Sequence, residues 1–194
     1  MISLSDVLKL SGIPLRNYKI QLATGKSPTP LEAYYSGAFK EWQEEQSNKN
    51  FQCDTVIGLI HLYKDQWLFA GAYKILGVKR GIKTAYLYQT ELLAGQEDLI
   101  GRIVVRYKRE FRASYIQGVK YGHQFEVAEI KPQKLTIQPF PGHNRVILPH
   151  HHLSTIARHE DPSWKSALSS VKGVYLIVDT TSGRMYVGSA TGNS

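Results

Sequence analysis

The chain has 194 residues, of which 42% are hydrophobic and 21% charged, and its formal net charge is +8. This length fits one domain, or one domain with part of a second, and the composition excludes an intrinsically disordered chain. No apolar run approaches the roughly 18 residues of a membrane-spanning helix, no secretory signal is recognisable, and a single cysteine excludes an internal disulfide. We therefore expect a cytoplasmic protein with no membrane partner.

The first part of the chain predicts short helices around one strand. Ser5 is placed as the N-cap of a helix over 6–10, and residues 16–22 have the composition of a strand. Apolar residues at helical spacing predict a helix over 31–46, although Gly37 weakens it.

From residue 51 to about residue 137 the pattern is typical of β-structure. The strands that it predicts cover 55–60, 67–73, 84–88, 101–107 and 125–130. Such a series suggests a small barrel or curled sheet flanked by helices. Trp67, Phe69 and Tyr73 alternate along one strand, and we expect them to lie in the core, with a base-stacking cage as the alternative.

The C-terminal part predicts a second domain. After a short helix over 151–158 and a junction near 159–163, two apolar runs at 173–179 and 184–190 flank a turn and predict a hairpin. The expected fold class is α+β, with a first domain over 1–160 and the start of a second over 163–194.

The positive charge is concentrated in one stretch, because residues 79–120 carry a net +5. A concentrated basic surface attracts polyanions, nucleic acid first. The alternative is a solvated basic face with no partner.

Two tripeptides in the predicted hairpin carry the most specific signal. Gly-Val-Tyr at 173–175 is followed, after ten intervening residues, by Tyr-Val-Gly at 186–188. This pair at this spacing resembles the GIY-YIG nuclease family, and the resemblance covers only about the last 30 residues. An ordinary hairpin with two tyrosines is the alternative interpretation.

The length of the hairpin loop decides whether the two tyrosines meet. A four-residue loop over 180–183 places Tyr186 opposite Ile177 and on the same face as Tyr175. A three-residue loop would place the two phenols on opposite faces. A shared site therefore predicts the four-residue loop.

The resemblance implies roles for these residues. In the family, two tyrosines flank the scissile phosphate, an arginine on the following helix stabilises the developing charge, and a later glutamate holds one divalent metal. Carried over, Tyr186 would help to activate the attacking water and Tyr175 would orient the water or the phosphate. A free phenol has a pKa near ~10, so this role needs a nearby metal or cation to lower it. Gly173 and Gly188 would let the backbone approach closely.

The sequence departs from the family pattern after the second motif. Only eight residues follow Tyr186, and none of them is arginine or glutamate. We therefore expect a fragment of a longer nuclease that uses Mg²⁺ or Mn²⁺, with no metal site in this chain and no cleavage by this chain alone.

Residues 102–115 interleave basic and aromatic side chains. On a strand, Arg102, Val104, Arg106 and Lys108 would share an exposed face, and a row of cations at about 6–7 Å spacing suits a phosphate backbone. The predicted nucleic-acid-binding residues are Arg102, Arg106, Lys108, Arg109 and Arg112. The alternative is an edge strand protected by its charge.

Histidines gather at 150–152, with His143 and His159 nearby. Consecutive residues on a helix point about 100° apart, so three in a row cannot hold one ion, and we expect no metal site there. We expect Cys53 to be buried and inert.

The part before the hairpin is similar in outline to PUA-like and EVE-like accessory domains, which bind RNA or modified DNA bases, and this resemblance is one of fold alone. We interpret the chain as the N-terminal part of a metal-dependent DNA endonuclease, and we expect its first domain to recognise DNA in preference to RNA. Restriction, phage defence and repair are not distinguished. The alternatives are a non-catalytic nucleic-acid-binding β-barrel, RNA included, and a protein-interaction scaffold.

Overall fold

The computed structural model describes residues 2–25, 28–110, 112–136, 140–148, 153, 156–157 and 162–191. The chain forms two compact units, residues 1–136 and 137–194. The boundary between these units lies before the predicted junction at 159–163. The assignment of residues 1–160 to substrate recognition stays a prediction.

The described elements are mixed helices and strands. The strands of the first unit are β1 (Tyr18–Ala23), β2 (Glu45–Gln46), β3 (Thr55–Tyr63), β4 (Gln66–Arg80), β5 (Tyr86–Leu92), β6 (Ile103–Arg106), β7 (Tyr115–Gln117) and β8 (Glu126–Ile130). Its helices are α1 (Leu4–Leu10), α2 (Pro30–Tyr35), α3 (Phe39–Glu44), α4 (Gly118–Tyr121) and the 3₁₀ turn η1 (Gly122–Gln124). The second unit contains η2 (His143–Arg145), α6 (Pro162–Ser169), β9 (Gly173–Val178) and β10 (Met185–Ala190).

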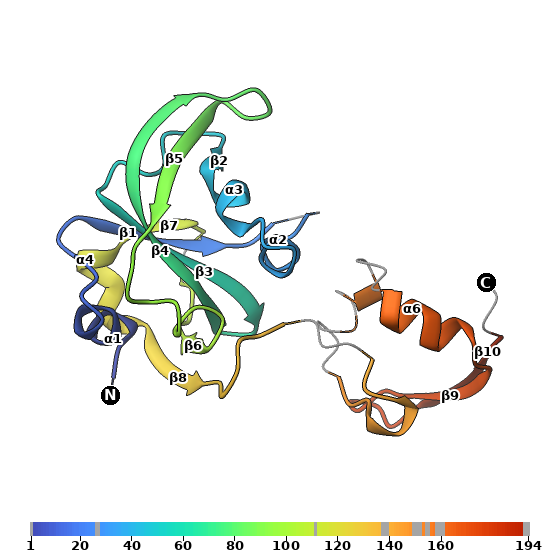
Figure 1. The fold of residues 1–194 in the computed structure, drawn as a ribbon. Helices are drawn as coiled ribbons and strands as arrows, with labels where there is room; N and C mark the ends of the chain where they lie inside the picture. Colours follow the sequence, from blue (N-terminus) through green and yellow to red (C-terminus); the bar gives the residue numbers. More distant parts are fainter. Residues whose placement is uncertain are drawn as a thin grey trace. The chain divides into compact units, whose positions relative to one another are not determined.

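One curled eight-stranded sheet organises the first unit (Figure 1). The strand order is β2-β5-β4-β3-β1-β7, and β6 pairs with both β4 and β8. Strand β4 is responsible for much of the curl, because its first residues pair with β6 and its last residues pair with β5. The predicted α+β class, with a curled sheet and short helices, is confirmed.

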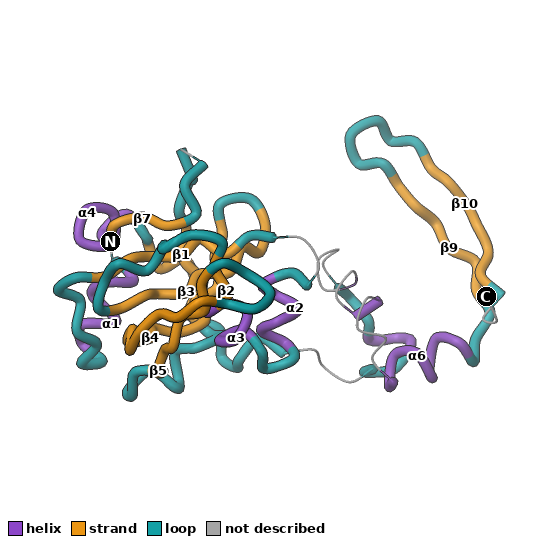
Figure 2. Tube along the Cα trace, turned by 90° about the horizontal axis from the view of Figure 1, so that it is seen from above, coloured by secondary structure: helices purple, strands orange, loops and turns teal. Residues whose placement is uncertain are grey.

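Both faces of the central part of this sheet are buried. Helices α1 and α4 lie on one side and α2 and α3 on the other (Figures 1 and 2). Ile57 and Leu59 belong to the core with α1, whereas Val56 and Ile60 belong to the core with α2 and α3. Because successive residues alternate between two apolar cores, the strands appear in the sequence as continuous hydrophobic runs.

Within β4, the residues that face the core with α1 change from odd to even positions at Gly71, and those that face the opposite core change from even to odd. Gly71 has a φ of +129°, and a Cβ at this position would lie 2.9 Å from the ring of Tyr73. Trp67 and Phe69 lie in the core with α1, while Tyr73 lies in the opposite core. All three are buried as predicted, but they do not form one stripe.

Two predicted helices have different bounds in the structure. The hydroxyl of Ser3 accepts a hydrogen bond from the amide of Asp6 at 3.2 Å, so Ser3 is the N-cap of α1 and the prediction of Ser5 is wrong. The predicted helix over 31–46 is divided into α2 and α3, because Gly37 takes a φ of +77° between them.

Candidate functional site

The β9–β10 hairpin has the register that a shared site requires. The amide of Asp179 donates to the carbonyl of Arg184 at 2.9 Å, and a four-residue loop lies between them. Tyr186 pairs with Ile177, as predicted. Tyr175 and Tyr186 therefore share one face, and their ring centroids are 6.2 Å apart. Their catalytic role stays a prediction.

The residues of the loop explain its length. Gly183 takes a φ of +71°, and its amide donates to the carbonyl of Asp179 at 2.7 Å. The carboxylate of Asp179 accepts hydrogen bonds from the Ser182 hydroxyl and from the amide of Thr181, and these bonds lower the pKa of Asp179. A loop closed by its own side chains holds the register that keeps both phenols on one face.

Gly188 has a steric reason to be glycine. It pairs directly with Tyr175, and a Cβ at this position would lie 2.4 Å from the phenol oxygen of Tyr175. The tyrosine ring thus lies over the glycine, an arrangement that supports glycine in strands. At Gly173 an added Cβ would meet no described atom within 4 Å, so no close approach explains that glycine.

The hairpin is exposed on both faces. Tyr175 is 43% exposed and Tyr186 60%, while Val174 and Val187 on the other face are 79% and 65% exposed. The phenols are therefore accessible to a macromolecular substrate.

The described residues do not fit a divalent metal site. Among them, no group of three or more His, Cys, Asp or Glu side chains could hold an ion. The hairpin carries one carboxylate, Asp179, whose oxygens bond to the turn. Histidines 150–152 and His159 lie outside the described residues, and His143 packs edge-on against Phe140. Mg²⁺ and Mn²⁺ prefer carboxylate oxygens, so the chemistry derived below uses the phenols alone.

Cys53 is half-buried, and burial raises the pKa of its thiol. The thiol is therefore protonated at neutral pH, which favours the inert role predicted for it.

The strand expected to carry the row of cations is buried on both faces. Strand β6 pairs on both sides, and Ile103, Val104 and Val105 are each 0% exposed. The expectation of an exposed face running through Val104 is wrong, because β6 lies inside a sheet that has a core on each face. An edge strand is excluded for the same reason.

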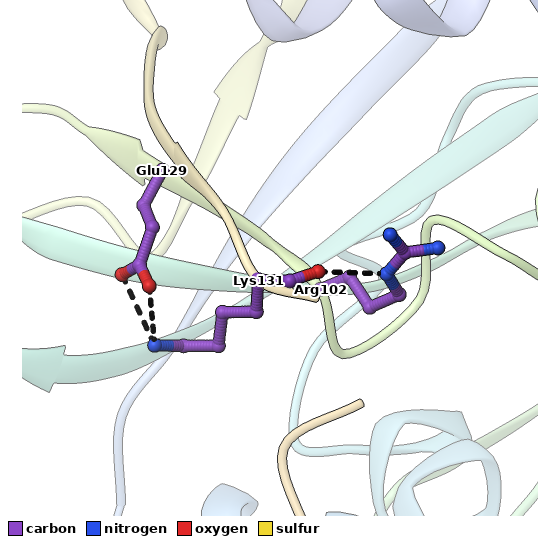
Figure 3. A network of polar contacts seen from close by, with 3 residues as sticks. All are labelled: Arg102, Glu129 and Lys131. Atoms are coloured by element: carbon purple, nitrogen blue, oxygen red, sulfur yellow. Dashed lines mark hydrogen bonds and ion pairs between the residues drawn. The ribbon is translucent and has the colours of Figure 1, made fainter. Parts of the chain in front are cut away.

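Arg102 bonds to protein acceptors (Figure 3). Its Nε donates to the carbonyl of Lys131 at 2.8 Å, and its Nη1 donates to the carbonyl of Asp98 at 3.2 Å. The ammonium of Lys131 lies 3.0 Å from both carboxylate oxygens of Glu129. This network fastens the segment after β8 to the start of β6, so a structural role explains Arg102.

The other predicted cations lie at or near the surface. Arg106 is 3.7 Å from the carboxylate of Glu126, and Arg109 donates to the carbonyl of Arg112. Lys108 and Arg112 are exposed. Contact of any of these side chains with nucleic acid stays a prediction.

A second basic site lies on the β4–β5 ribbon, the paired ends of β4 and β5 that extend beyond β3. An open pocket of about 490 Å³ is lined by Lys49, Val78, Lys79, Arg80, Ala85 and Tyr86. Lys79 and Arg80 contribute to the charge of residues 79–120, but nothing in the sequence singles them out. Lys49 comes well before them in the chain, and only the strand pairing brings it close.

No protein-family model, curated protein or solved structure matches this chain. No helix in the described part of the chain is long and apolar enough to cross a bilayer. The functional argument therefore depends on the hairpin geometry and on the distribution of charge.

Proposed function

We propose that this chain carries the tyrosine hairpin of a GIY-YIG-like nuclease that hydrolyses DNA phosphodiesters, and that its first unit holds the substrate. The observation that best supports this proposal is the register of β9 and β10, which places Tyr175 and Tyr186 on one exposed face. The loop chemistry and the Tyr175 ring over Gly188 both favour this arrangement.

In this proposal the scissile phosphate lies against the face that bears both rings. Tyr186, acting as a phenolate, accepts a proton from the attacking water, whose oxygen forms a bond to phosphorus, and later returns that proton to solvent. The bond from phosphorus to one ester oxygen breaks, and that oxygen takes a proton from solvent. Tyr175, whose ring is held over Gly188, donates its hydroxyl hydrogen to a phosphate oxygen and orients the group.

The basic first unit supports a nucleic-acid partner. Exposed cations such as Arg106, Lys108 and Arg112 contribute a positive surface that attracts a phosphate backbone. We propose DNA in preference to RNA because the hairpin resembles that of DNA nucleases.

The test is cleavage of supercoiled plasmid in Mg²⁺ by the protein as its gene encodes it, including any residues that follow Ser194. Tyr186→Phe removes the proton acceptor and should lower the cleavage rate by about 10²–10⁴-fold. Tyr63→Phe removes an exposed phenol from β3 in the first unit and should leave the rate unchanged.

Three results of this assay bear on the proposal. Removal of divalent ions with EDTA should stop cleavage, because the nuclease family that the hairpin resembles uses one divalent metal. Cleavage by Tyr186→Phe at the wild-type rate would contradict the proposal. Binding without cleavage by the gene-encoded protein would favour a non-catalytic nucleic-acid-binding function.

A further inference from the structure

We propose that the pocket on the β4–β5 ribbon binds an unpaired nucleic-acid strand, with phosphates on Lys49 and Arg80 and one base stacked on Tyr86. This inference deepens the proposed function and rests on it for the choice of nucleic acid as the polyanion.

The pocket lies on a part of the sheet that solvent reaches from both sides. Lys74 is the last residue of β4 that pairs with β3, and beyond it β4 pairs with β5. The ribbon arches away from β3 (green in Figure 1). Arg80 pairs directly with Tyr86, so their side chains share one face of the ribbon.

The loop that carries Lys49 is held in place by buried and half-buried groups. The side-chain Nδ2 of Asn50 donates to Gln46 Oε1 at 2.8 Å, and Lys19 Nζ donates to the backbone carbonyl of Asn50 at 2.6 Å. Gln46 itself pairs with Tyr86 across β2 and β5. These contacts place Lys49 Nζ 5.8 Å from the centroid of the Tyr86 ring, so the site is preorganised.

The positive charge of the pocket is not neutralised by the described residues. Their ion pairs are Lys40–Glu44, Arg106–Glu126 and Lys131–Glu129. Lys49, Lys79 and Arg80 take part in none of these, and no carboxylate lines the pocket. The register places Lys79 on the opposite face of the ribbon, in one row with Leu87 and Glu45, so we assign the phosphates to Lys49 and Arg80. A concave site with charge of one sign concentrates the local field.

Tyr86 supplies the surface for a base. It is half-buried and packs against the core with α2 and α3, which restricts the motion of its ring. An aromatic ring beside cations is the combination that binds single strands, where bases stack on the ring and cations follow the backbone. In a duplex the base faces are already stacked on one another, so this pocket favours an unpaired strand. Its volume of about 490 Å³ suits one nucleotide.

The test measures fluorescence anisotropy of a labelled single-stranded oligonucleotide and a duplex of equal length, titrated with the 194-residue chain at several salt concentrations. For the single strand, the double variant Lys49→Ala/Arg80→Ala should lower the slope of log affinity against log salt by about 1.4, or 0.7 per lost phosphate contact. The matched control Lys9→Ala/Lys120→Ala removes the same charge from α1 and α4 and should leave the slope unchanged.

The ring is tested separately from the charge. Tyr86→Leu should weaken single-strand binding by about 5- to 150-fold, the range for one stacked base, at an unchanged salt slope. Tyr86→Phe keeps the ring and should bind like the wild type. Thermal unfolding checks each variant, and the Lys49→Ala/Arg80→Ala result decides the matter if Tyr86→Leu does not fold.

The inference is overturned if the pocket pair and the control pair change the slope equally, if Tyr86→Leu binds like the wild type, or if the duplex is preferred. These outcomes concern binding by the 194-residue chain. Failure of the proposed nuclease function would instead appear as a lack of cleavage by the gene-encoded protein, so the two failures are distinguishable.

Discussion

The sheet of the first unit and the β9–β10 hairpin are built from the same kinds of residue and use them in opposite ways. Leu59 and Phe69 in the sheet are 0% exposed, whereas Ile177 in the hairpin is 58% exposed and Val187 65%. In the sheet, β-branched and aromatic residues alternate between two cores. In the hairpin, both faces are open, and local turn chemistry sets the register. Stability is therefore concentrated in one region and accessible chemical groups in the other.

The tyrosines show the same contrast. Burial raises the pKa of seven of the twelve tyrosines, and all seven are in the first unit: Tyr18, Tyr34, Tyr35, Tyr73, Tyr88, Tyr107 and Tyr115. These phenols are structural. Tyr175 and Tyr186 are exposed, and the argument for a chemical role concerns them alone.

Matched truncations should give the largest difference between the two regions. Phe69→Ala removes a ring that is 0% exposed and should lower the free energy of unfolding by about 3–5 kcal/mol. Ile177→Ala removes a side chain that is 58% exposed and should change it by about 0.5 kcal/mol or less. Urea unfolding measures both, followed by the fluorescence of buried Trp67 in the first unit and of buried Trp164 in the second. Equal losses would mean that the hairpin packs as tightly as the sheet.

Alanine substitution should have different effects at Gly118 and Gly188, two glycines that each lie beneath a tyrosine ring. A Cβ at Gly118 would lie 1.9 Å from the Tyr18 ring, which is 6% exposed and bonded to Ser5, so Gly118→Ala should cost about 1–3 kcal/mol. At Gly188 the ring in the way is that of Tyr175, which is 43% exposed and can turn toward solvent. Gly188→Ala should therefore cost little stability and still slow cleavage by displacing Tyr175.

Thermal unfolding and plasmid cleavage, measured on both alanine variants, separate these effects. A Gly188→Ala protein that cuts at the wild-type rate would show that the position of the Tyr175 ring does not matter. A Gly118→Ala protein as stable as the wild type would show that the Tyr18 ring moves freely.

The smallest of the predicted effects is a loss of folding stability at alkaline pH, which begins just above about pH 10. The buried tyrosines have a raised pKa in the folded state, so the stability that they contribute is present below about pH 10 and is lost as pH rises toward the folded values. Urea unfolding of the first unit at pH 8, 9.5 and 10.5 should show falling stability only above about pH 10. Stability that stays constant through this range would contradict the burial of these phenols.

The parts of the fold that depend on local sequence could be predicted. The hairpin register follows from a four-residue loop with Gly183, and the apolar runs of β3 and β4 follow from burial on both faces. Tertiary pairing decided the rest. The sequence around Val104 alternates like that of an edge strand, and only the pairing of β6 with β4 and β8 buries both its faces. The short strands β2 and β7 carry too few residues to show a pattern.

The candidate sites also divide into one that local sequence determines and one that tertiary pairing determines. Tyr175 and Tyr186 are connected by a hairpin, so their spacing in the sequence determines their geometry. The pocket around Tyr86 joins β4, β5 and the loop with Lys49, and no local pattern reports such a contact. Arg102 shows the converse case: its charge predicts a phosphate contact, which stays a prediction, while its guanidinium donates to two backbone carbonyls that no local pattern indicates.

The central claim is that the first unit grips the nucleic acid and the hairpin performs the cleavage. The most direct measurement determines both Kd and the single-turnover cleavage rate at saturating DNA, using the gene-encoded protein and a duplex with an unpaired stretch. Tyr186→Phe should lower the saturated rate by about 10²-fold or more with Kd unchanged, whereas Lys49→Ala/Arg80→Ala should raise Kd and keep the saturated rate within about twofold. A Tyr186→Phe protein that retains the rate, or a pocket variant that loses the rate as severely as Tyr186→Phe, would contradict the claim.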